Sequence, residues 1–177
     1  MTIFNYIVFA FIINSTGCFG QEKQIFLINE VLFEIPGEWE ARGQLVESGQ
    51  HHLHNKKSQI NLMISARDRK KFDFDKKIKG YELVETFYNW EKDYWTSDNG
   101  RKANVEILKK DSTEKYIIWQ LNTEVITNDN EIKSISSIFL YTIKKDKLIS
   151  INYFEDNSKQ VKLSTQEIMD YLVSIKP

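Results

Sequence analysis

The chain has 177 residues, of which 13% are aromatic and 28% are charged, with 24 basic against 25 acidic side chains. The even mixture of lysines and acidic residues argues against a nucleic-acid partner, which would need a basic face, and the aromatic content argues against disorder. Without a short leader the chain is still of the usual size for one domain, so one domain is expected.

The first 20 residues form a segment of different composition, with no Asp, Glu, Lys or Arg. Its apolar run at 7–13 is far shorter than the ~20 residues that a membrane-spanning helix needs, and small residues follow at 15–17. We therefore expect residues 1–20 to be a signal peptide that directs export to the periplasm or envelope of a bacterium, although its first residues lack the usual Lys or Arg.

The only cysteine, Cys18, leaves two processing routes open. Thr16-Gly17-Cys18 resembles the end of a lipobox, in which the cysteine is lipidated and becomes the first mature residue, although Ser15 stands where that motif usually has Leu. Plain cleavage after Gly20 is the alternative, because small residues occupy the two critical positions before it. A lipid on Cys18 would be the protein's contact with a membrane, and a single cysteine predicts no intrachain disulfide.

The domain is expected at 30–177, after a lead-in at 21–29 whose IFLI run is either a linker or a first strand. The stretch VLFEIPGEW at 31–39 alternates apolar and polar residues, then stops at Pro36-Gly37 before Trp39, which is typical of a strand that ends in a turn. Further strands are expected at 39–46, 50–55 and 59–67, with a hairpin loop at 55–58.

Between residues 80 and 96 the apolar residues recur every three to four positions, which predicts a helix. The segment 98–100 is expected to end this helix. We expect the apolar stripe of this helix to face the sheet. The stripe comprises Leu83, Phe87, Trp90 and Tyr94.

Four strands then follow at 102–110, 115–126, 132–144 and 147–154, separated by turns so short that an antiparallel meander is expected. Ile117 and Trp119 lie on one face and Tyr116 and Ile118 on the other, so both faces of the sheet should be covered. The S-x-x-E pattern at 164–167 predicts a capping box and a last helix.

The stretch Phe33, Ile35, Pro36, Gly37 and Trp39, with the order of elements over roughly 30–176, resembles the PsbP-like fold family. That family includes photosystem II extrinsic proteins and bacterial envelope lipoproteins such as DcrB. The resemblance implies an α+β domain in which an antiparallel sheet of about six to seven strands is flanked by a central and a C-terminal helix, as an α/β/α sandwich. It also implies a non-catalytic binding or assembly module without a cofactor, whose partner is an unidentified envelope protein.

His52 and His54 are the candidate metal ligands, because alternate residues of a strand point to one side about 7 Å apart. A metal site would need further ligands, and a solvated hairpin is the favoured interpretation. Two other functions stay open: a periplasmic immunity or inhibitor protein, and a metal-dependent hydrolase that uses these two histidines. No nucleophile elbow supports catalysis.

Tyr88 and Trp95 are the candidate partner anchors. Both are expected at the edge of the helix stripe, where an aromatic side chain can contribute a large contact area with little loss of rotamer freedom.

Export predicts that the mature protein begins at Cys18 or at Gln21. Intact-mass analysis of the protein from an envelope fraction is expected to give one of these two starts, with or without the mass of a lipid. A mass that retains Met1, found in a cytosolic fraction, would contradict both.

Overall fold

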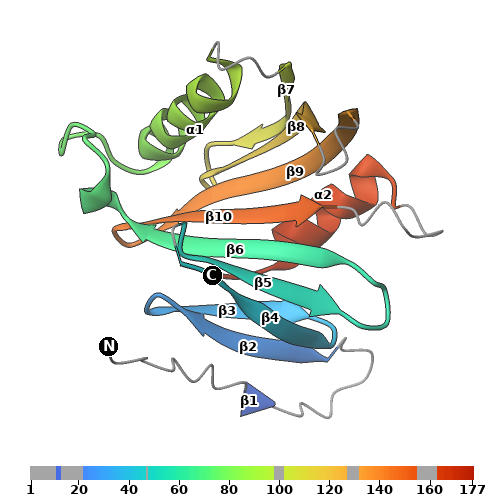
Figure 1. The fold of residues 1–177 in the computed structure, drawn as a ribbon. Coiled ribbons are helices and arrows are strands. Elements are labelled where there is room, and N and C mark those ends of the chain that lie inside the picture. Colours follow the sequence, from blue (N-terminus) through green and yellow to red (C-terminus); the bar gives the residue numbers. More distant parts are fainter. Residues whose placement is uncertain (1–10, 13–21, 47, 98–101, 127–131, 155–162) are drawn as a thin grey trace, which may run out of the picture.

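The computed structural model describes residues 11–12, 22–46, 48–97, 102–126, 132–154 and 163–177, with backbone only at 11–12, 125–126 and 132–133. Its centre is an antiparallel sheet of seven strands in the order β4-β5-β6-β10-β9-β8-β7 (Figure 1). In chain order these strands are β4 (Trp39–Leu45), β5 (Gln50–Asn55), β6 (Asn61–Asp68), β7 (Ala103–Asp111), β8 (Tyr116–Ile126), β9 (Ile132–Lys144) and β10 (Lys147–Phe154).

A smaller sheet has the order β1-β2-β3, with β1 at Phe11–Ile12, β2 at Lys23–Ile28 and β3 at Val31–Pro36. Asn29 and Glu30 connect β2 to β3, and both have a positive φ, as a two-residue hairpin turn requires. Of the two interpretations of the IFLI run, the structure therefore has the strand. The two residues of β1 belong to the expected signal peptide, and they pair with β2.

The helices α1 (Tyr81–Thr96) and α2 (Thr165–Ser174) lie on opposite faces of the large sheet. A short 3-10 turn, η1 (Arg69–Lys71), follows β6. The capping box is present as predicted, because the Ser164 hydroxyl accepts from the Glu167 backbone and the Glu167 carboxylate accepts from Ser164. The sequence-based prediction of an α+β domain, with an antiparallel sheet between two helices, is confirmed.

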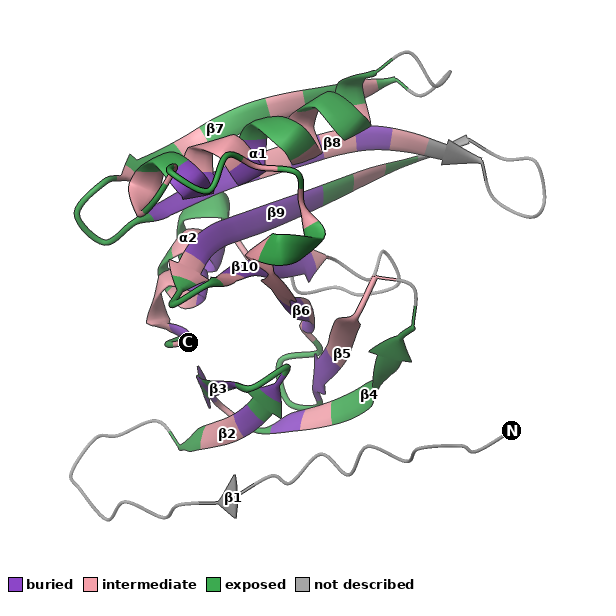
Figure 2. Cartoon of the chain, turned by 90° about the vertical axis from the view of Figure 1, so that its left-hand side faces the viewer, coloured by how far each residue is buried: buried purple, intermediate pink, exposed green. Residues whose placement is uncertain are grey.

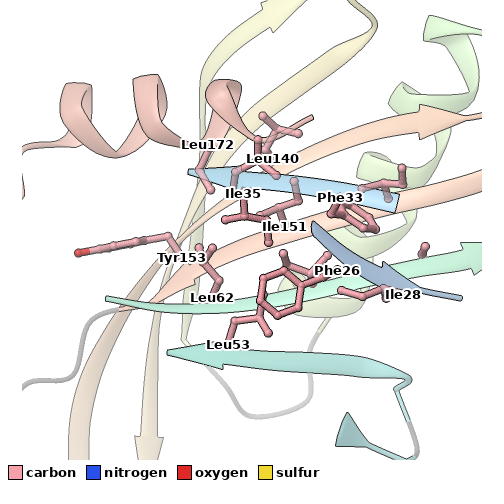
Figure 3. Packing of buried hydrophobic residues seen from close by; sticks show 14 of the residues in the cluster. Phe26, Ile28, Phe33, Ile35, Leu53, Leu62, Leu140, Ile151, Tyr153 and Leu172 are labelled. Atoms are coloured by element: carbon pink, nitrogen blue, oxygen red, sulfur yellow. The ribbon is translucent and has the colours of Figure 1, made fainter. Parts of the chain in front are cut away.

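Alternation along the strands builds two separate cores. On β8, Ile117 and Trp119 pack toward α1, whereas Tyr116 and Ile118 pack toward α2 and the β2–β3 hairpin. β9 is buried from 137 to 142, between the two helices (Figure 2). The α2 core is the larger of the two and is filled by aliphatic and aromatic side chains (Figure 3), among them Phe26, Phe33, Ile35, Leu62, Ile151 and Leu172.

The turn after β3 contacts both the large sheet and α2 through hydrogen bonds to a single backbone oxygen. The carbonyl oxygen of Pro36 accepts hydrogen bonds from the Trp39 indole and from the Tyr171 hydroxyl, both at 2.8 Å. Gly37 has φ +97°, and a Cβ there would lie 3.0 Å from the side-chain nitrogen of Asn55. A side chain at Gly37 would therefore be both strained and crowded.

Most predicted element boundaries lie within two residues of those observed. The strands at 50–55, 132–144 and 147–154 match to the residue, and α1 ends at Thr96 as expected. The predicted helix stop at 98–100 and the turn predicted between the strands at 115–126 and 132–144 lie outside the described residues.

Trp39 and Trp119 are buried as predicted, with 7% and 0% of their surface exposed. Replacing either by Ala should lower the free energy of unfolding by about 3–5 kcal/mol, because a large cavity replaces the ring. Urea denaturation followed by circular dichroism measures this loss. Trp90→Ala is the matched control: Trp90 is 44% exposed, and we expect a loss of about 1 kcal/mol there. Equal losses at all three positions would contradict the assigned burial.

Candidate functional site

Side chains of α1 and of the loop at 69–79 that precedes it form an exposed aromatic surface; Figure 1 shows the course of these two segments. Trp90 and Tyr94 are 44% and 54% exposed on the helix. The loop supplies the other two rings: Phe72 lies 5.1 Å from Trp90 and 5.2 Å from Phe74, between ring centroids. We call Phe72, Phe74, Trp90 and Tyr94 the aromatic surface.

An ion pair supports this surface from below. The Arg67 guanidinium on β6 lies 2.7 Å from a carboxylate oxygen of Glu91 on α1, and both side chains are less than one fifth exposed. The same guanidinium lies over the rings of Phe72 and Phe87, at 5.4 and 4.9 Å from their centroids. The pair therefore fixes the loop, the helix and the sheet relative to one another.

The prediction that Trp90 and Tyr94 face the sheet is wrong. The buried residues of α1 are Leu83, Val84, Phe87 and Tyr88. Position 91 continues this stripe toward the sheet, because it lies three residues after Tyr88 and four after Phe87 on the helix. Glu91 occupies the inward position and pairs with Arg67, which turns Trp90 to the side. The spacing was readable from the sequence, but a glutamate is not expected to face a core without its partner in view.

The expected edge position of Tyr88 is also not observed. Tyr88 is 5% exposed and packs edge-on against Trp119, at 5.7 Å between centroids. Trp95 is half-buried against the α1 core and lies 5.6 Å from Tyr94. Trp95 can therefore lie at the border of a contact surface, whereas Tyr88 belongs to the core.

The loop at 69–79 carries six basic and two acidic residues. Arg69 is engaged within the loop, because its guanidinium donates to the carbonyl oxygens of Ile78 and Asp75. The lysines of the loop are exposed. They are Lys70, Lys71, Lys76, Lys77 and Lys79, so the loop that supplies Phe72 and Phe74 also carries exposed positive charge.

His52 and His54 point to one side of β5, as predicted, and meet a third residue on β6. His52 Nε2 lies 3.3 Å and His54 Nδ1 lies 2.9 Å from the side-chain oxygen of Asn61. The ring of Phe154 lies 5.4 Å from that of His52. His51 lies on the opposite face, where burial lowers the pKa of its imidazole. Asn61 was not anticipated, because only the strand register brings it opposite His54.

The described residues contain no group of three or more His, Cys, Asp or Glu side chains that could hold a metal ion.

A cleft of about 560 Å³ lies beside Pro36, Ile60 and Tyr171. Burial raises the pKa of the Tyr171 hydroxyl, which stays protonated and donates to Pro36. Cys18, the candidate lipidation site, lies outside the described residues.

The comparisons with known proteins bear on the fold. No family model and no curated protein matches the chain. Among solved structures, the solution structure of cyanobacterial PsbP (CyanoP) from Synechocystis sp. PCC 6803 is similar over 92% of this chain and 97% of that one, with a TM-score of 0.50 and 16% sequence identity. The chain has a PsbP-like fold. None of the helices that the structure describes is long and apolar enough to cross a membrane.

The PsbP-like fold confirms the topology that the Pro-Gly-x-Trp stretch indicated. At 16% sequence identity the likeness to CyanoP concerns the fold alone, so a function has to be inferred from the residues of this chain. Two groups of side chains are candidates for a functional site. They are the aromatic surface over the Arg67–Glu91 ion pair and the cluster of His52, His54 and Asn61.

The ion pair beneath the aromatic surface predicts a large stability effect. Glu91→Ala should cost about 3–5 kcal/mol in the free energy of unfolding, because it leaves the Arg67 charge buried and unpaired. Glu85→Ala is the control, since Glu85 pairs with Lys110 at 2.9 Å with both side chains more than a third exposed. That loss should stay below about 1 kcal/mol in the same urea titration. Equal losses would show that the buried pair does not hold α1 in place.

Proposed function

We propose that this protein is an exported, non-catalytic binding module of the cell envelope, and that it docks a partner protein through its aromatic surface. The observation that carries the proposal is the exposure of Trp90 and Tyr94 over a rigid base. The PsbP-like fold and the uncharged leader support export and an accessory role.

Exposed aromatic side chains that are held in place are typical of contact surfaces. Trp90 stands on Phe72 and Phe87, with ring centroids 5.1 and 6.3 Å away, so it has little freedom to lose when a partner covers it. Aromatic anchors of this kind contribute most of the binding energy of many interfaces. The surface therefore offers contact area that is already ordered.

The charges of the loop favour an acidic partner. The loop at 69–79 has a net charge of +4, from six basic and two acidic residues, whereas the whole chain has −1. Complementary charge accelerates association and orients the partner. We expect a protein segment with apolar side chains for the aromatic surface and acidic residues for the lysines.

The neighbours of the histidines bear on the alternative of a hydrolase that uses them. Among the described residues, His52 and His54 contact an amide oxygen rather than a serine, a cysteine or a carboxylate. A general base that activates a nucleophile would need such a neighbour within hydrogen-bond reach.

Site-specific cross-linking tests this function. A photoreactive phenylalanine analogue in place of Trp90, expressed in the native host, should give one dominant protein adduct in the envelope. The same analogue in place of Gln44, an exposed residue on the edge strand β4, should not give this adduct. Identical adducts from the two positions, or none from Trp90, would contradict docking at the aromatic surface.

A pair of charge reversals tests the acidic character of the partner. Lys76→Glu with Lys77→Glu should strongly lower the yield of the Trp90 adduct, because these exposed lysines lie in the loop that supplies two rings of the aromatic surface. Lys56→Glu with Lys57→Glu changes the net charge equally in the exposed β5–β6 loop and should leave the yield unchanged. Equal losses from both pairs would show that only overall charge matters.

A further inference from the structure

The cluster on β5 and β6 brings three metal-binding side chains together independently of the aromatic surface. Residues His54 and Asn61 are direct partners in the antiparallel register, and His52 lies two positions before His54 on the same face. His52 Nε2 and His54 Nδ1 approach the same oxygen of Asn61, at 3.3 and 2.9 Å. Two nitrogens and one oxygen thus converge.

These separations match those between ligands of a single ion. Zinc binds imidazole nitrogen at about 2.0–2.1 Å, so two ligands at an angle of 90–110° lie roughly 2.8–3.4 Å apart. Both distances from an imidazole nitrogen to the Asn61 oxygen fall in that range. An ion could therefore replace the two hydrogen bonds once both imidazole rings turn their nitrogens from the Asn61 oxygen toward it.

A fourth side chain of the right chemistry is adjacent. Met63 is the register partner of His52, so the two side chains lie on the same face of neighbouring strands. Both are partly exposed, which gives an ion access from solvent. On the next strand, Asn152 pairs with Met63, and its buried side-chain oxygen has no hydrogen-bond partner among the described residues.

We propose that His52, His54 and Asn61 bind a transition-metal ion, and that copper is preferred over zinc. Imidazole suits both ions, a thioether such as that of Met63 on the neighbouring strand favours Cu(I), and divalent copper binds most nitrogen and oxygen sites more tightly than zinc does. The amide oxygen of Asn61 is a neutral ligand, so the affinity should be moderate. A carboxylate at that position would add charge and tighten the site.

Titration calorimetry of the untagged protein with Cu²⁺ and Zn²⁺ tests the proposal. The wild type should bind one equivalent of Cu²⁺ more tightly than Zn²⁺. His52→Ala and His54→Ala should each weaken binding by at least about tenfold, because each removes one of few ligands. Asn61→Asp should tighten binding by about tenfold, a gain that a purely structural hydrogen bond would not produce.

His51→Ala is the matched control, because His51 is the neighbouring histidine on the opposite face, and its affinity should equal that of the wild type. Circular dichroism of each variant checks the fold. If His54→Ala does not fold, His52→Ala and Asn61→Asp decide the matter, since His52 is partly exposed. The proposal is overturned if no binding occurs up to about 1 mM metal. It is equally overturned if the affinity of His52→Ala equals that of the wild type, or if Asn61→Asp does not tighten binding.

Discussion

The carbonyl oxygen of Pro36 accepts hydrogen bonds from the Trp39 indole and from the Tyr171 hydroxyl, and these donors come from a sheet strand and from the last helix. Tyr171 is 135 positions away in the chain. Because both donors are largely withdrawn from water, losing the shared acceptor would leave two polar groups unsatisfied. The turn therefore sets the position of the β2–β3 hairpin and of α2 on the same face of the sheet, and the core between them follows from that placement.

Once that face is filled, α1 covers the other. Its inner side holds Leu83, Phe87 and Tyr88 against Trp119 and Tyr141, and it also carries Glu91, whose charge requires Arg67 beneath it. Satisfying this pair rotates Trp90 outward, onto the loop that carries Phe72 and the lysines. The exposure of Trp90 thus follows from the position of the charged Glu91, which occupies the side of α1 that faces the sheet. Exposed apolar patches of this kind are typical of interaction sites.

The sequence was informative wherever a pattern is local. Alternation at 31–35, the Pro36-Gly37 stop and the S-x-x-E box each specify a structure through neighbouring residues, and all three are observed. It was less informative where a partner is remote. Glu91 reads as a surface residue until Arg67, 24 positions earlier, is placed beneath it, and so Trp90 and Tyr94 were assigned inward. The two histidines were readable from their spacing, whereas Asn61 emerges only from the register of β5 and β6.

Oxidative footprinting with hydroxyl radicals measures the central claim directly, because it reports how accessible each aromatic side chain is in its native setting. Trp90 and Tyr94 are expected to be oxidised readily in the purified protein and to be protected in intact envelopes, where a partner covers them. Trp39 and Trp119 should resist oxidation in both preparations, since both are buried. Equal oxidation of Trp90 and Tyr94 in the two preparations would contradict the account.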